Sequence, residues 1–145
     1  MFENMNFLKD AKIVRVANAA AGGQTTLTTS AVDTQGFNSV VFVAALGAVT
    51  DASVLTLSVL TNPTNSNSGG TAAADTATLT AASSSNGLMA IEANKPRQRY
   101  AYATLGRATQ NAAVDGIFAI LFNAQERPVT QDATLLSSKF TNDEA

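Results

Sequence analysis

The 145-residue sequence contains no cysteine, no histidine and no tryptophan. Without cysteine the chain has no disulfide, no thiol nucleophile and no thiolate ligand for zinc. Without histidine it lacks the commonest general base and metal ligand of proteins, so a Ser-His-Asp triad in its usual form is excluded. Any catalysis would have to depend on carboxylates, hydroxyls, lysine and arginine.

Positive charge is absent over a long stretch, since no lysine or arginine occurs from Val16 to Asn94. The basic residues lie toward the two ends of the sequence, and the formal net charge is −2. A weakly acidic chain has no global basic field to hold nucleic acid, so we expect no nucleic-acid partner.

Charged residues of either sign are few, at 14% of the chain against about 25% in ordinary soluble proteins. Few charges mean little repulsion against self-association or against docking on a partner. The longest apolar run, Val40 to Val49, is far below the roughly 20 residues of a spanning helix, so we expect no membrane partner. The first residues show no basic segment followed by an apolar one, which predicts a product made in the cytoplasm.

Short runs of alanine, threonine, valine and leucine, separated by glycine, asparagine and serine, are typical of strands joined by turns. Eight strands are predicted, at residues 11–18, 24–32, 39–46, 54–61, 76–82, 88–93, 99–105 and 114–122. This number and spacing predict an all-β chain folded as a single-domain antiparallel β-sandwich, jelly-roll-like. The sandwich would span residues 11–122, with an extended N-terminal arm at 1–10 and a polar C-terminal tail at 123–145.

Two segments lead to more specific expectations. The continuous apolar run at 39–46 predicts a central strand covered on both faces. Residues 19–23 read as a loop, and the glycine pair Gly22-Gly23 resembles a phosphate-binding loop only superficially, because no Gly-Lys-Thr ending follows. We expect a hairpin turn there.

Five carboxylates could supply a glycosidase-like pair: Asp33, Asp51, Asp75, Glu92 and Asp115. Each is expected singly at a strand end or in a turn, where local hydrogen bonding already accounts for aspartate. No closely spaced series of acidic residues suggests calcium. The sequence thus predicts no enzyme, no cofactor, no metal and no small-molecule substrate.

The densest chemical cluster is residues 95–102, with three positive charges and two tyrosines. Such a mixture suits single-stranded nucleic acid, but the segment is short and the chain acidic. Alternation along a strand would place Arg97 and Arg99 on one face and Tyr100 and Tyr102 on the other. This pattern favours an exposed, charged strand edge over a packed pair of tyrosines. A protein contact through arginine and tyrosine is the next interpretation.

A succession of segments resembles a known family. The segments are residues 11–19, 30–37, 95–100, 114–120 and 127–132. Together they resemble small head proteins of tailed bacteriophages, and are most similar to the cement (decoration) proteins of short-tailed phages of the Bordetella type. The resemblance covers most of residues 11–135 in order, and is weakest at 62–86.

The resemblance implies a structural virion protein: a jelly roll on the outer surface of the capsid that stabilises the lattice of the major capsid protein. It also implies self-association as a homodimer or homotrimer, with both terminal segments adding contacts on the shell. The candidate capsid-interface residues are Phe2, Phe7, Leu8, Lys12, Arg15, Arg97, Arg99, Tyr100, Arg127, Pro128 and Gln131. The alternative is a carbohydrate-binding β-sandwich, a receptor-binding or adhesin module of a phage particle, with Tyr100 and Tyr102 as its sugar platform.

Overall fold

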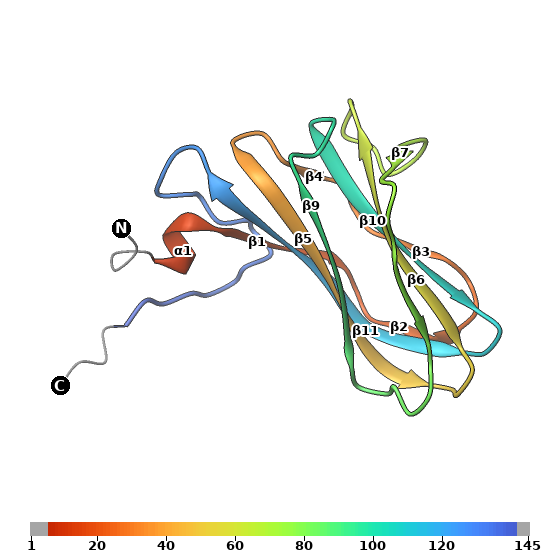
Figure 1. Cartoon of the computed structure of the whole chain (residues 1–145). Helices are drawn as coiled ribbons and strands as arrows, with labels where there is room; N and C mark the ends of the chain where they lie inside the picture. The colour runs from red at the N-terminus through yellow and green to blue at the C-terminus, as the bar shows by residue number, and fades with distance from the viewer. Residues whose placement is uncertain (1–5, 142–145) are drawn as a thin grey trace.

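Two antiparallel sheets pack face to face in the computed structural model, which describes residues 6–141 (Figure 1). The one helix of this part of the chain is a single turn, α1 (Phe7–Asp10). The strands are β1 (Lys12–Ala17), β2 (Ala20–Gly23), β3 (Leu27–Thr28), β4 (Val32–Asp33), β5 (Phe37–Val49), β6 (Val54–Asn62), β7 (Thr71–Ala72), β8 (Ala77–Thr80), β9 (Leu88–Asn94), β10 (Tyr100–Ala108) and β11 (Ala112–Ala124).

The strand order confirms the predicted β-sandwich. The five-stranded sheet runs β1-β11-β5-β9, with β2 also on β11; the six-stranded sheet runs β3-β10-β6-β7, with β4 on β10 and β8 on β6. We treat β3 and β4 as one interrupted strand and set aside the short β2 and β7. The eight remaining strands then have the order of a jelly roll: the first, eighth, third and sixth form one sheet, and the second, seventh, fourth and fifth form the other.

The core lies between the two sheets and follows the alternation of the sequence. Leu55 and Leu57 of β6 face Phe42 of β5 and Ile117 of β11 across it, and all four side chains are fully buried. The hydroxyl residues between them, such as Thr56, point outward and are half-buried. The strand predicted at 54–61 is therefore confirmed as β6.

The expectation that residues 39–46 are covered on both faces is wrong. β5 is central in its sheet, as predicted, because it pairs with β11 on one side and β9 on the other. Val40 and Phe42 are buried in the core, whereas Val41 and Val43 are only half-buried. The physical reason is that a jelly roll has two layers, so the second face of a central strand is an outer surface.

The strand predicted at 24–32 is also wrong, since it divides into β3 and β4. Between them Thr29 is fully buried, and its Oγ1 accepts a hydrogen bond from the Ala103 amide at 2.9 Å. Thr29 also donates its own amide to the Ala103 carbonyl. A side-chain oxygen thus takes part in pairing with β10 and interrupts the regular ladder.

The loop predicted at 19–23, with its hairpin turn, is a strand instead. β2 pairs with β11, with Gly23 opposite Ala112. Packing favours glycine at position 23, because a Cβ atom there would lie in tight contact with the guanidinium of Arg107, at 3.1 Å. Small residues in this segment admit the arginine side chain, and the sequence pattern alone suggested a turn.

Arg97 and Arg99 are exposed, as predicted, but their segment does not lead into the strand edge that was predicted. β10 is central in the six-stranded sheet, with β6 on one side and β3 and β4 on the other. The predicted packing is confirmed for Tyr102, which is only 2% exposed and whose hydroxyl accepts a hydrogen bond from the Gly70 amide at 2.9 Å. The long polar loop after β6 folds over this tyrosine and removes its ring from the surface.

Candidate docking face

The outer face of the five-stranded sheet is apolar. Register places Ile13 of β1 opposite Ile120 of β11, and Ile120 opposite Val41 of β5. Residues directly opposite in an antiparallel pair share a face, so these side chains form one surface. We call this surface the apolar face; its members are Ile13, Val41, Val43, Ala45, Leu88, Ala90, Phe118, Ile120 and Phe122. They are half-buried or exposed, and Leu88 is 71% exposed.

The outer face of the other sheet has a different chemistry. Register there places Thr56 opposite both Thr78 and Gly106, and Ser58 opposite Thr104. Hydroxyl side chains and glycine hydrate readily, whereas valine, isoleucine and phenylalanine do not. The molecule is thus asymmetric, with one outer face suited to water and the other suited to contact with protein.

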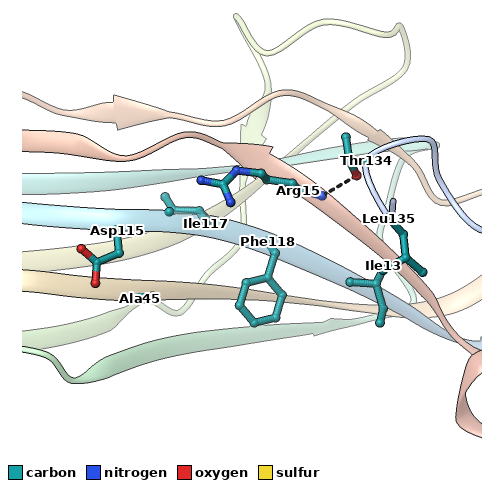
Figure 2. A pocket seen from close by; sticks show the side chains of 9 residues that line it. Ile13, Arg15, Ala45, Asp115, Ile117, Phe118, Thr134 and Leu135 are labelled. Atoms are coloured by element: carbon teal, nitrogen blue, oxygen red, sulfur yellow. Dashed lines mark hydrogen bonds between the residues drawn. The ribbon is translucent and has the colours of Figure 1, made fainter. Parts of the chain in front are cut away.

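One hollow of about 340 Å³ lies on the apolar face near the C-terminal tail. Figure 2 shows Phe118 projecting from β11 over β5, with Ile13 of β1 and Leu135 of the tail beside each other at one end. Arg15 and Asp115 supply charged groups at its margin. The Arg15 guanidinium lies over the backbone at Gly116, where a Cβ atom would be 3.1 Å from its nitrogen.

A second hollow, of about 470 Å³, lies at the α1 end of the same face. Its apolar lining comes from Val41, Ile120 and Phe122 of the sheet together with Phe7 of α1. Glu92, which is exposed, stands at its margin. We call this the α1 hollow. It is the more apolar of the two, and the charged side chains of its lining are Glu92, Asp10 and Arg127, of which the last two form an ion pair with each other.

Residues 7–11 and residues 127–135 pack together against β1, and we call these two segments the terminal unit. Gln131 makes the central contacts: its Oε1 accepts from the Ile13 amide at 3.0 Å, and its Nε2 donates to the carbonyls of Leu8 and Ala11. Arg127 forms an ion pair with Asp10 at 3.2 Å. The tail thus runs beside α1 and β1, as seen at one side of Figure 1.

Two further hydrogen bonds hold the tail alongside α1 and β1. The Val129 amide donates to the Lys9 carbonyl at 2.9 Å. Further along, the Arg15 amide donates to Thr134 Oγ1 at 2.9 Å (Figure 2). This terminal unit borders the apolar face and frames its two hollows.

Most of the predicted interface residues meet in this unit. Those brought together are Phe7, Leu8, Lys12, Arg15, Arg127, Pro128 and Gln131. Their roles differ. Phe7 is 55% exposed and is free to contact a partner, whereas the side-chain amide of Gln131 forms hydrogen bonds within its own chain. Lys12 and Pro128 line a shallow hollow beside the start of β5. Phe2 lies outside the described residues.

The other predicted residues, Arg97, Arg99 and Tyr100, stand at the start of β10 on the opposite sheet. Arg99 forms an ion pair with Asp33 at 2.8 Å and lies over the Tyr100 ring, 5.2 Å from its centroid. The hydrogen bond from Arg99 lowers the pKa of the Asp33 carboxyl below its ordinary value of 3.8. Arg97 is exposed beside a hollow between the sheets.

The five carboxylates occupy separate environments, except that Asp75 and Glu92 line the same hollow. Asp33 is paired with Arg99, and Asp51 accepts a hydrogen bond from the Ser83 amide. Asp75 and Glu92 line one hollow at the edges of the two sheets. Within residues 6–141 no three histidine, cysteine or acidic side chains are grouped as they would be to hold a metal ion.

Sequence reasoning did not find the apolar face. The signal was present in the run at 39–46, which is apolar at both its odd and its even positions. We interpreted this as a strand covered on both faces by other parts of the same chain. Strand β11 carries the same signal, because Phe118 and Ile120 alternate with the buried Ile117 and Leu121. A strand that is apolar at every position in a two-layer fold indicates an outer contact surface.

No protein-family model matches this chain, and no curated protein matches it significantly. Among the described residues, no helix has the length and apolar character needed to cross a membrane.

Proposed function

We propose that this protein is a capsid decoration protein, which binds the outer surface of a phage head and stabilises the lattice of its major capsid protein. The observation that supports this most is the apolar face, which covers the middle of the five-stranded sheet and is bordered by the terminal unit. A broad, shallow apolar surface without a deep cleft is typical of contact with another protein. The resemblance of the sequence to phage cement proteins supplies the kind of partner.

The mechanism of stabilisation follows from mass action. A protein that binds the assembled shell and not its separated subunits shifts the equilibrium toward the shell. Each copy contributes a modest interaction, and the symmetry of the lattice repeats it many times. The residues proposed to touch the shell are Phe118, Val43 and Ala90 at the centre of the apolar face, with Arg15 at its margin. The hydroxyl-rich outer face of the other sheet would point to solvent.

The carbohydrate-binding alternative loses support from the position of its proposed platform. Tyr102 is buried beneath the loop after β6, and Tyr100 is covered on one side by Arg99. A stacking platform for sugar requires exposed ring faces. No other observation on the described residues favours this function.

The experiment is titration of purified protein onto phage heads that lack it, with sedimentation and gel densitometry to count bound copies. We expect saturable binding at hundreds of copies per head, together with survival of the heads at a higher temperature. A dozen copies or fewer would indicate a tail or portal site and contradict the proposal. Unchanged heat resistance at saturation would contradict the cementing role. Binding to a glycan array with no binding to heads would favour the carbohydrate module.

A further inference from the structure

The end of the polar C-terminal tail carries two large apolar side chains that are exposed to water. Residues 136–141 take part in none of the hydrogen bonds of the described chain. Leu136 is 92% exposed and Phe140 is 62% exposed. In an extended chain these two side chains lie on the same side, because they are an even number of positions apart, at i and i+4. Two large apolar groups facing water side by side form a short adhesive segment.

The tail leaves the sandwich in a defined direction. The Leu135 amide donates to the Asp132 carbonyl at 3.0 Å, which closes a turn at the end of the terminal unit. Beyond this turn the chain leads away from both sheets, on the same side as α1 (Figure 1). Six extended residues reach roughly 20 Å, which is enough to enter a neighbouring molecule.

The α1 hollow has the complementary chemistry. Its floor of Ile120, Val41 and Phe122 is apolar, and its volume of about 470 Å³ is ample for an aromatic side chain. Glu92 at its margin has no ion-pair partner among residues 6–141. Lys139, the neighbour of Phe140 and the only charged residue of the segment 136–141, likewise has none there.

We propose that the tail segment 136–141 of one copy binds in the α1 hollow of a second copy of this chain. Phe140 would fill the hollow, Leu136 would cover its rim, and Lys139 would pair with Glu92. Tail and hollow lie on the same side of the molecule, so two copies can exchange tails reciprocally. The exchange would occupy the α1 end of the apolar face and leave its centre, around Phe118, for the shell. The proposal concerns the purified protein and does not depend on binding to a capsid.

Covalent trapping tests the proposal directly, because the chain has no cysteine of its own. Lys139→Cys and Glu92→Cys are made in separate chains of different mass, mixed, and oxidised. We expect a disulfide-linked heterodimer on a non-reducing gel, since the proposed contact brings the two positions within the range of a disulfide. The matched control is Leu88→Cys with Lys139→Cys, because Leu88 is exposed on the same face but outside the hollow. No heterodimer, or one formed equally by the control pair, overturns the proposal.

A chain carrying both Lys139→Cys and Glu92→Cys distinguishes two arrangements: a tail bound in the hollow of a second copy, and a tail folded back into the hollow of its own copy. A disulfide formed only within single chains would mean that the tail occupies its own hollow, and would overturn the proposal.

Sedimentation velocity gives the solution test: the double variant Leu136→Ser, Phe140→Ser should raise the dissociation constant of the assembly about tenfold or more, while Leu88→Ser leaves it unchanged. Both substituted tail residues are exposed, so folding is not at risk. A wild-type chain that stays monomeric at high concentration would also overturn the proposal.

Discussion

Arg107 shows most clearly how one residue organises this fold. It is 5% exposed, and its guanidinium donates to the carbonyls of Thr25, Ala21 and Ala112, and to the Thr25 hydroxyl. A buried arginine needs hydrogen-bond partners, and here three carbonyls and a hydroxyl supply them rather than a carboxylate. The side chain thereby ties β2 and the following turn to β10 and β11.

Replacing Arg107 with leucine should destabilise the protein by about 3 kcal/mol or more, because the buried Ala112 carbonyl loses its donor and three further hydrogen bonds of the guanidinium are lost as well. Urea-induced unfolding followed by circular dichroism measures the change. Arg97→Leu is the matched control: it is exposed and should change the free energy of unfolding by no more than about 0.5 kcal/mol. A loss below about 1 kcal/mol for Arg107→Leu would show that the arginine is dispensable.

The ion pair of Asp33 with Arg99 predicts a small dependence of stability on pH. The folded-state pKa of Asp33 is lowered by the hydrogen bond from Arg99, so its contribution is complete above the ordinary value of 3.8 and is lost as the pH falls through the folded value. Both side chains are substantially exposed, so the contribution is below about 1 kcal/mol.

Asp33→Asn should therefore be less stable than the wild type at pH 7 and indistinguishable from it near pH 2. Urea unfolding at several pH values measures the difference. Asp75→Asn, an exposed position with no ion pair in the described structure, serves as the control. A difference between Asp33→Asn and the wild type that stays constant from pH 7 to pH 2 would contradict this account.

At the scale of elements, the alternation of apolar and hydroxyl residues predicted the long strands well. Residues 54–61 and 88–93 appear as β6 and β9 with nearly the same bounds. Alternation could not predict the short strands, since these depend on contacts distant in sequence: Thr29 with Ala103, and Gly23 with Arg107. The candidate site depends on such contacts too. Its residue types were visible in the sequence, but only the strand order brings β1, β5 and β11 into one face.

In the terminal unit, Gln131 joins the C-terminal tail to α1 and β1. The side chain of Gln131 makes three hydrogen bonds to α1 and β1. Gln131→Ala should therefore lower the free energy of unfolding by about 1–3 kcal/mol and release the tail locally. Hydrogen exchange should increase at the amides of residues 11–15 and 129–134 and stay unchanged in β6. Thr130→Ala, at an exposed neighbouring position, is the control. Unchanged exchange in Gln131→Ala would contradict the anchoring role.

At the scale of the whole molecule, the function follows from the difference between the two outer faces. One sheet presents Thr56, Ser58 and Thr104, and the other presents Val43, Phe118 and Leu88. Both faces have the same backbone architecture, so the difference lies in side chains alone. Burial of the apolar face against a partner would remove from water a surface that folding leaves exposed.

The most direct test of this account substitutes matched positions on the two outer faces and measures binding to phage heads. Val43→Glu places a charge at the centre of the apolar face, and Thr56→Glu places the same charge on the hydroxyl-rich face; both positions are half-buried. With both variants shown to be folded by circular dichroism, the account predicts that Val43→Glu reduces the affinity for heads at least about tenfold, or about 1.4 kcal/mol, while Thr56→Glu binds like the wild type. Equal binding by the two variants, or a loss confined to Thr56→Glu, would contradict it.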